Sequence, residues 1–272
     1  MPMAKKKTAG KIPSTGLKLF SIHPLTNNQK VAFEEYQANQ NLFLHGVAGT
    51  GKTFVALYLA LNEVLSGLSD YFRVVIVRSA VASRDIGFLP GNVKDKIKEF
   101  EAPYVSICTD LFGRGDAYQI LKDKKIVEFT STSFIRGITL RDTIVIIDEI
   151  QNYTFHEASS VLTRIGKNCR VMVAGDFRQS DLFGRQRAGL SKLISVAKDM
   201  PSFSFVEFGI NDIVRSGFVR EFLISCLKYE DEECHTLNMS YGNGIVKSPP
   251  LRPNGAGTII RPPASFPPLQ QP

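Results

Sequence analysis

A glycine-rich run at residues 46–53 constrains this chain more than any other part of its sequence, because it reads GVAGTGKT. It fits G-x-x-x-x-G-K-[ST] at every fixed position, and that spacing is typical of a loop that wraps a phosphate group between a strand and a helix. The apolar residues 42–44 precede the run, and residues 54–61 after it have a helix-forming pattern. This order of strand, loop and helix agrees with the motif, so we predict that the chain binds a nucleoside triphosphate.

The residues of this loop have separate predicted roles. The glycines leave room for backbone N–H groups to converge on the β-phosphate, which side chains would block. Lys52 is expected to reach the β- and γ-phosphates, and the Thr53 hydroxyl is expected to be a Mg²⁺ ligand. The predicted nucleotide-binding set of the loop is Gly46, Val47, Ala48, Gly49, Thr50, Gly51, Lys52 and Thr53.

A second apolar run, at residues 144–147, ends in the acidic pair Asp148 and Glu149. An enzyme with a phosphate-binding loop needs a carboxylate at the end of such a strand to hold Mg²⁺, and we assign this role to Asp148. Glu149 is placed to orient and deprotonate an attacking water, so we predict that it is catalytic. Two acids at a strand-to-turn junction are common by themselves, and the assignment therefore depends on the loop at residues 46–53.

Three further polar residues are candidates for the same site. Gln179 follows the apolar run 171–174, and its amide suits contact with both the γ-phosphate and the catalytic water. Arg215 comes at the stage of the chain where a cation for the transition state is expected, but it equally suits an ordinary surface helix. Gln29 suits adenine recognition through its amide, while residues 26–28 also fit plain helix capping. These alternatives stay open on the residues alone.

Short β-branched runs alternate with longer helical patterns through the middle of the chain. This alternation predicts an α/β fold in which crossover helices cover a parallel sheet. Two of the runs are apolar at consecutive positions, as strands buried on both faces must be. The expected strands cover residues 42–45, 73–78, 125–129, 143–148, 170–175 and 203–208.

Composition divides the 272 residues into three expected parts. Residues 1–24 are basic and are expected to form a flexible arm, and residues 25–235 are expected to form one nucleotide-binding domain. Residues 236–272 are expected to be a disordered tail, because eight of the fourteen prolines lie beyond residue 240. The tail is either solvated or a polyproline II ligand for another protein.

The net charge of +7 belongs to the two ends, since every acidic residue lies between Glu34 and Glu233 and the residues between the ends total −1. The total charge therefore does not indicate a basic face on the domain, and the arm serves either weak phosphate-backbone binding or solubility. Spanning a bilayer takes about 18 apolar residues in a row, which the chain lacks. We expect a cytoplasmic location and no membrane partner.

Taken together, these motifs resemble the PhoH-like proteins, which are phosphate-starvation-inducible ATPases related to superfamily 1 helicases. The resemblance runs from about residue 25 to residue 222, and short members of this family include many carried by tailed phages. It implies a three-layer P-loop NTPase (RecA-like) fold, ATP with Mg²⁺ as cofactors, Gln29 as the adenine reader and Arg215 as an arginine finger. The motifs that carry it are GFLPG at 87–91, FIRGIT at 134–139, DEIQN at 148–152, GDFRQSDL at 175–182 and DIVR at 212–215.

The resemblance also implies partners. Ile150 departs from the alanine that is common in the family, and residues 79–85 depart where helicase relatives contact single strands. The leading hypothesis is an ATPase coupled to single-stranded RNA or DNA, with helicase action and a link to phosphate starvation. A nucleotide-gated assembly or regulatory module without strand coupling is the alternative.

A superfamily 1 helicase clamps ATP between two cores of this kind, whereas residues 25–235 fit one. We therefore expect a homo-oligomer, with a ring such as a hexamer as its candidate form, in which Arg215 completes the ATP site of the next subunit. A central pore would then lie beside residues 79–91 and 131–137. Arginines there are candidates for contacts with the phosphates of a strand, namely Arg78, Arg84 and Arg136.

Overall fold

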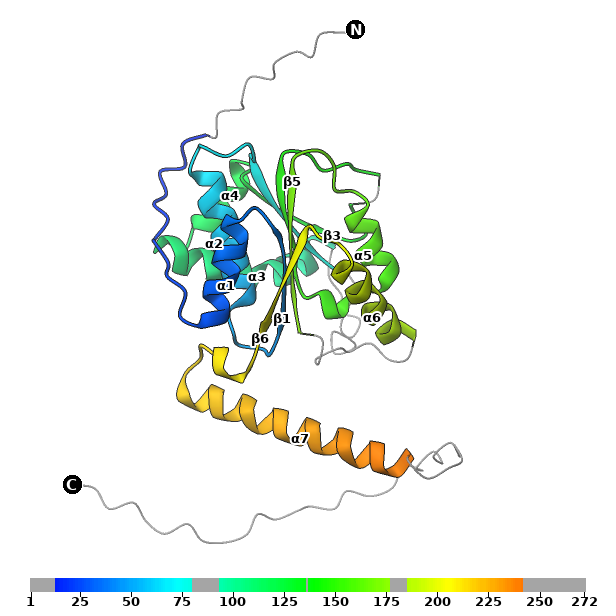
Figure 1. Ribbon diagram of the computed structural model, residues 1–272. Helices are drawn as coiled ribbons and strands as arrows, with labels where there is room; N and C mark the ends of the chain where they lie inside the picture. The colour runs from blue at the N-terminus through cyan, green and yellow to red at the C-terminus, as the bar shows by residue number, and fades with distance from the viewer. Residues whose placement is uncertain (1–12, 80–92, 136, 177–184, 242–272) are drawn as a thin grey trace, which may run out of the picture. The chain divides into compact units, whose positions relative to one another are not determined.

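The computed structural model describes residues 13–79, 93–135, 137–176 and 185–241 (Figure 1). The chain divides into a compact body, Met1–Ser225, and a second unit, Cys226–Pro272. Every residue considered below as part of the site belongs to the body.

A parallel sheet of six strands is the centre of the body, with the strand order β3-β2-β4-β5-β1-β6. Each pair of neighbouring strands runs in the same direction. All carboxyl ends therefore meet at one edge, where ligands of open α/β sheets bind. The strands are β1 Asn41–Gly46, β2 Arg73–Arg78, β3 Val127–Ser131, β4 Thr143–Ile147, β5 Cys169–Gly175 and β6 Phe203–Phe208.

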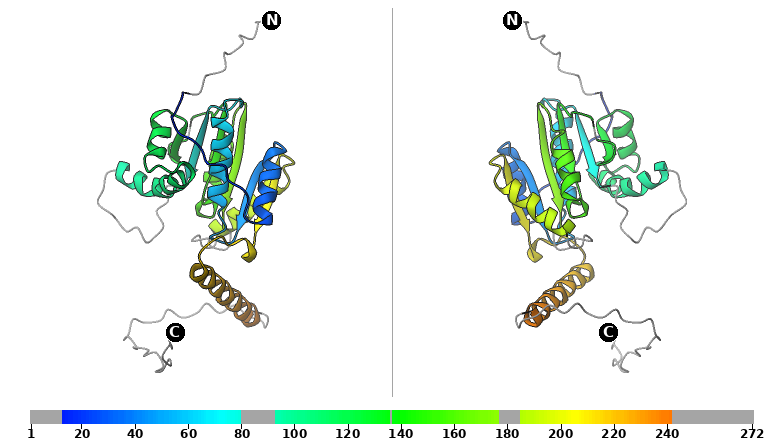
Figure 2. Two further views of the ribbon diagram at one scale, coloured as in Figure 1. Left: turned by 90° about the vertical axis from the view of Figure 1, so that its left-hand side faces the viewer. Right: turned by 90° about the vertical axis from the view of Figure 1, so that its right-hand side faces the viewer.

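Helices cover both faces of this sheet and complete three layers (Figures 1 and 2). One face packs against α1 Asn27–Gln37, α2 Lys52–Leu65, α3 Val93–Phe112 and α4 Ala117–Asp123. The other packs against the short turn η1 Ile150–Asn152 and the helices α5 Phe155–Leu162 and α6 Arg185–Lys198. A second short turn, η2 Ile210–Asp212, and the helix α7 Gly217–Tyr241 follow the last strand.

Alternation along the strands builds these two cores. Ile144 and Ile146 of β4 face the core below α1 to α4, whereas Val145 and Ile147 face the core below α5 and α6. All four side chains are at most 1% exposed, as expected for a central strand of a sheet covered on both faces. The three-layer α/β fold predicted from the sequence is thus confirmed.

All six predicted strands are present, and their ends shift by two residues or fewer. The largest shift has a local cause at the start of β3. Lys125 has a φ of 57°, and the Ile126 N–H donates to the Leu121 carbonyl 2.9 Å away. These two residues therefore close the end of α4, and pairing with β2 starts only at Val127.

The segment before α1 differs from the flexible arm expected up to residue 24. Leu17, Leu19 and Ile22 pack against the core beneath α1 to α4. The Phe20 N–H donates to the Leu111 carbonyl over 2.9 Å, at the end of α3. Residues 17–22 are therefore held on the body, while residues 1–12 lie outside the described part of the chain.

At the other end, the boundary expected at residue 235 falls inside α7, which continues to Tyr241. The rest of the expected tail, residues 242–272, lies outside the described residues. Among the residues that the structure describes, no helix has the length and apolar character to cross a membrane.

The close approach of β1 to β6 gives a test of the fold. A Cβ atom at Gly46 would lie 2.1 Å from the Phe208 carbonyl oxygen, whereas one at Gly67 would meet no atom within 4 Å. Both residues have a positive φ, 120° and 69°. We expect Gly67→Ala to cost about 1 kcal/mol and Gly46→Ala at least about 3 kcal/mol, measured by urea unfolding. Equal losses would contradict the steric account.

Candidate nucleotide-binding site

The loop after β1 is fixed at several backbone points. The Val47 N–H donates to the Phe208 carbonyl at 2.9 Å, and the Gly49 carbonyl accepts from the Val214 N–H at 3.1 Å. Gly49 and Gly51 have φ values of 76° and 81°, in the left-handed region that glycine adopts without strain. The loop therefore takes the glycine-dependent conformation that its sequence predicts, at the start of α2.

Lys52 points back into this loop. Its Nζ donates to the Gly46 carbonyl at 2.8 Å and to the Val47 carbonyl at 2.7 Å, and the residue is 9% exposed. Burial lowers the pKa of Lys52, and the carboxylates of Asp176, Glu149 and Asp148 oppose this shift. The ammonium is therefore held where a phosphate bound by the loop would meet it.

Asp148 is joined to the loop and to α3. Its Oδ1 accepts a hydrogen bond from Thr53 Oγ1 at 2.8 Å, and its Oδ2 accepts one from the Tyr104 hydroxyl at 2.7 Å. Asp148 is 3% exposed and Tyr104 is 1% exposed. Burial and the charge of Asp148 raise the pKa of Tyr104, so this hydroxyl stays protonated and donates. The predicted pair of Thr53 and Asp148 is brought together, and Tyr104 was missed.

Glu149 begins the turn that leaves β4, with a φ of 54°. Its carboxylate accepts from Gln151 Nε2, and Gln151 Oε1 in turn accepts from the Asp176 N–H at 3.0 Å. Burial and the neighbouring Asp148 raise the pKa of Glu149, while the charge of Arg78 opposes them. Gln151 therefore ties the ends of β4 and β5 together, a role that its place in the DEIQN run did not reveal.

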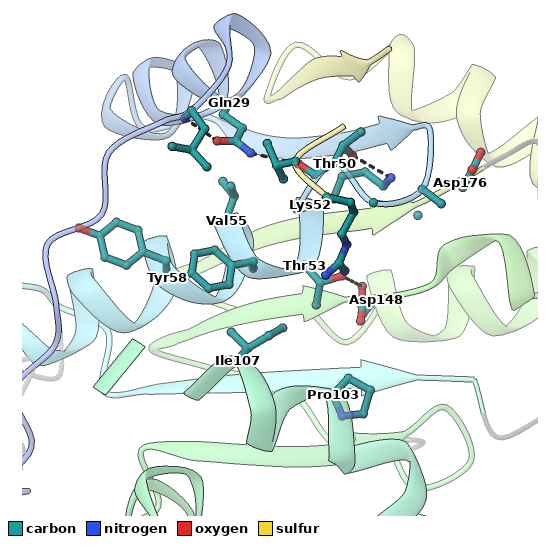
Figure 3. A pocket seen from close by; sticks show the side chains of 18 of the residues that line it. Gln29, Thr50, Lys52, Thr53, Val55, Tyr58, Pro103, Ile107, Asp148 and Asp176 are labelled. Carbon is teal, nitrogen blue, oxygen red and sulfur yellow. Dashed lines mark hydrogen bonds between the residues drawn. The ribbon is translucent and has the colours of Figure 1, made fainter. Parts of the chain in front are cut away.

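Apart from Tyr104, these groups line one cavity of about 570 Å³. Figure 3 shows Thr53 and Asp148 facing each other beside Lys52, with Tyr58 and Ile107 on another side of the space. The cavity thus has a polar part at the loop and an apolar part between α2 and α3. Its size is that of sites for small ligands and cofactors.

Gln29 lies at the rim of the loop, where its amide joins two segments. Its Nε2 donates to the Thr50 carbonyl at 3.1 Å, and its Oε1 accepts from the Leu25 N–H at 2.8 Å. The Thr26 hydroxyl caps α1 by accepting from the Gln29 N–H. Helix capping and a role of the Gln29 side chain are therefore both present, and adenine recognition stays a prediction.

Arg215 lines the cavity of its own chain. A Cβ atom at Gly49 would lie 3.1 Å from Arg215 Cγ, so the side chain passes next to the loop. The backbone bond from Val214 to Gly49 draws the segment after η2 onto the loop. The expected role of Arg215 in the site of a neighbouring subunit stays a prediction.

The remaining predicted residues divide into two groups. Arg78 lines the cavity, and its guanidinium lies 5.5 Å from the centre of the Phe100 ring. Its expected contact with the phosphates of a nucleic-acid strand stays a prediction. Gln179, Arg84 and Arg136 lie outside the described residues, so their roles stay predictions.

A family model described as PhoH-like protein matches residues 21–226. The chain belongs to the PhoH-like protein family. A PhoH-like protein of Mycobacterium leprae (strain TN) is 32% identical over 221 residues, which are 81% of this chain and 62% of that protein. The PhoH-like protein of Bacillus subtilis (strain 168) is 31% identical over 204 residues, 75% of this chain and 63% of that protein. The chain thus spans about six-tenths of the length of these curated relatives.

Among solved structures, the helicase domain of Pyrococcus furiosus Hef aligns with 68% of this PhoH-like chain and 39% of that chain. The TM-score is 0.41 and the sequence identity is 12%, a likeness too weak to bear on function. The resemblance predicted from the motifs is confirmed at the level of the family.

Glu157 of α5 contacts residues near the starts of the two segments, 79–91 and 131–137, that we expected beside the pore of a ring. Its Oε1 accepts from Ser79 Oγ and from Thr132 Oγ1, both at 2.9 Å. Its Oε2 accepts from the N–H and hydroxyl of Thr154, in a capping box at the start of α5. Burial raises the pKa of Glu157, but the hydrogen bonds outweigh it and the net shift is downward.

This depressed pKa predicts how stability depends on pH. Glu157 stabilises the fold at pH values above 4.5, the ordinary pKa of a glutamate. This contribution to the free energy of unfolding is lost as the pH falls through the lower pKa that Glu157 has in the folded chain. We expect Glu157→Gln to lower the free energy of unfolding at pH 7 by about 1–2 kcal/mol, and the difference to shrink below pH 4.5. Urea unfolding at pH 7 and pH 4 measures it, with the exposed Glu128→Gln as control. A loss that is independent of pH would contradict the account.

Proposed function

We propose that this PhoH-like chain is an enzyme that hydrolyses ATP with Mg²⁺. One observation carries the proposal: the Thr53 hydroxyl lies 2.8 Å from Asp148 Oδ1, and Lys52 and Glu149 line the same cavity. A cation, a hydroxyl–carboxylate pair and a second carboxylate are the groups that phosphoryl transfer to water requires.

The donor set fits Mg²⁺. Thr53 and Asp148 offer a hydroxyl and a carboxylate oxygen, and Mg²⁺ takes oxygen ligands with one or two carboxylates beside the phosphates. When bound, the ion would neutralise charge on the β- and γ-phosphate oxygens. Lys52 would hold the same phosphates from the loop side, where its Nζ now meets the Gly46 and Val47 carbonyls.

Glu149 is the proposed general base. Its backbone conformation at the end of β4 sets it beside Asp148, and Gln151 donates to its carboxylate. The raised pKa of Glu149, caused by burial and by the neighbouring Asp148, makes it a stronger base than an exposed glutamate. Glu149 is therefore suited to accept a proton from the attacking water.

We propose that the nucleobase of the nucleotide binds in the apolar part of the cavity, beside Tyr58 and Ile107. Gln29 supports adenine as the base, since its amide uses only one donor and one acceptor position in the two bonds to Thr50 and Leu25. One N–H and one lone pair of the amide are left for a nucleobase edge.

The roles of Lys52 and Glu149 predict different failures. Lys52→Ala removes the phosphate cation, so nucleotide affinity should fall about 10- to 100-fold. Glu149→Gln keeps that cation and removes the base, so it should bind ATP normally and hydrolyse it at least about 100-fold more slowly. Phosphate release and fluorescent-nucleotide titration measure the two effects, and hydrolysis by Glu149→Gln at the wild-type rate would overturn the assignment.

Two controls belong to this experiment. Glu128→Gln changes an exposed carboxylate on β3 and should leave both readouts unchanged. A mixture of Lys52→Ala and Arg215→Ala chains regains hydrolysis only when Arg215 acts on a neighbour's site. Because Arg215 lies beside Gly49 of its own chain, we expect no recovery.

Coupling to single-stranded RNA or DNA is the finer part of the proposal, and the links to helicase action and phosphate starvation rest on the family resemblance alone. The hydrogen bonds of Glu157 support coupling between nucleic-acid binding and hydrolysis, because they join Ser79 and Thr132 at the carboxyl ends of β2 and β3. Arg78 lies next to Ser79 and lines the ATP cavity. A nucleic-acid strand that moves this edge of the sheet would therefore act on a residue of the proposed ATP site.

Assembly into a homo-oligomer is also proposed. Phe218 and Phe222 at the start of α7 are 80% and 61% exposed, and a spacing of four residues sets them on one side of the helix. Aromatic side chains are enriched at contact surfaces between proteins. The same observation favours the second candidate function, a nucleotide-gated assembly without strand coupling.

Hydrolysis with and without single-stranded RNA and DNA separates the two functions. For a strand-coupled ATPase we expect several-fold stimulation that weakens as salt rises, because phosphate contacts release counterions. Lys52→Ala should abolish the hydrolysis in every condition. Unstimulated hydrolysis, with an oligomer size by light scattering that changes on adding ATP, would instead support the assembly function.

A further inference from the structure

Tyr104 contacts Asp148 from outside the phosphate loop and the sheet. It lies near the middle of α3, and its hydroxyl donates to Asp148 Oδ2 at 2.7 Å. Asp148 Oδ1 points to Thr53 Oγ1. Each oxygen of this carboxylate thus has its own donor, one from α2 and one from α3.

The Tyr104 side chain is 1% exposed, and its hydroxyl donates to Asp148 in place of water. Its ring is held by the core and by Phe129, whose ring centre lies 5.8 Å away at an angle of 44°. The position of the hydroxyl is therefore fixed by packing. A fixed donor on one carboxylate oxygen fixes the direction of the other oxygen.

We propose that Tyr104 is a positioning residue that orients Asp148 for Mg²⁺, an inference that rests on the proposed ATPase function. With Oδ2 held by Tyr104, Oδ1 stays directed at Thr53. Asp148 Oδ1 and Thr53 Oγ1 can then face the ion together. Without that bond the carboxylate is free to turn about its Cβ–Cγ bond. Tyr104 itself does not line the cavity, so its proposed action on the ion passes through Asp148.

The backbone of α3 gives this bond a second consequence. Pro103 and Ile107, which flank Tyr104 in α3, line the cavity where the base is proposed to bind. Figure 3 shows both side chains on the α3 side of the space. One helix therefore sets the wall of the base pocket and the orientation of the metal carboxylate.

Tyr104→Phe tests the proposal, with Tyr118→Phe as a matched control. Tyr118 is also buried in this core, and its hydroxyl also donates to a carboxylate, that of Glu101, at 3.0 Å. We expect Tyr104→Phe to raise the Mg²⁺ concentration for half-maximal hydrolysis about 10- to 100-fold, with little change in rate at saturating Mg²⁺. Tyr118→Phe should leave the requirement unchanged.

A second readout does not depend on turnover. In a titration with a fluorescent ADP, Tyr104→Phe should lower the affinity for the nucleotide in the presence of Mg²⁺ at concentrations that saturate only the wild type. In EDTA its affinity should equal that of the wild type. Phe129→Leu loosens the packing of Tyr104 and should raise the Mg²⁺ requirement in the same direction by less, which keeps the test open if Tyr104→Phe does not fold.

The outcomes are distinguishable. Wild-type hydrolysis with an unchanged Mg²⁺ requirement in folded Tyr104→Phe would overturn the positioning role and leave the ATPase proposal standing. An equal shift in Tyr118→Phe would reduce Tyr104 to a packing role. A wild-type chain that neither hydrolyses ATP nor binds Mg²⁺–ADP would overturn both proposals.

Discussion

The contact between the end of β1 and the end of β6 is the constraint on which the rest of the site depends. Gly46 has room beside the Phe208 carbonyl only because it lacks a side chain, and the Val47 N–H bonds to that same carbonyl. The loop leaves the sheet in one direction as a result, and α2 starts at Lys52. The direction of α2 then decides where Thr53 meets the end of β4.

Asp148 shows how a central strand and its two cores fix a functional group. The Asp148 N–H donates to the Val77 carbonyl at 3.1 Å, and the Tyr153 hydroxyl donates to the same carbonyl at 2.7 Å. Tyr153 packs in the core covered by α5 and α6, and Tyr104 of α3 packs in the core on the other face, so the two faces of the sheet both contribute. The carboxylate is held from its backbone and from its side chain, and burial strengthens each of these bonds.

Sequence patterns predicted the strands and the two halves of the phosphate site because these depend on local order. The loop pattern and the acidic pair each occupy consecutive residues, and parallel strands bring their ends together. Tyr104 depends on a contact between elements far apart in the chain, and nothing in its own neighbourhood marks it. Gln151 and Glu157 lie in local patterns, the DEIQN run and a capping box, but these patterns do not reveal which distant residues the two side chains contact. Residues 17–22 pack on the body through Leu17, Leu19 and Ile22. The alternation of Leu17 and Leu19 indicates this packing, but the basic composition of residues 1–24 led us to expect a flexible arm.

The position of Arg215 follows from the same distinction. Its motif indicates a cation for the transition state but carries no information about which chain receives it. Asp212 fixes the position of the segment within its own chain, because its carboxylate accepts from Asn28 Nδ2 at 2.7 Å and from the Gly209 N–H at 2.9 Å. The segment before Arg215 is thereby fastened to α1, which also carries Gln29. Arg215, Gln29 and the loop are thus joined into one connected unit, because Val214 bonds to Gly49 and Gln29 bonds to Thr50.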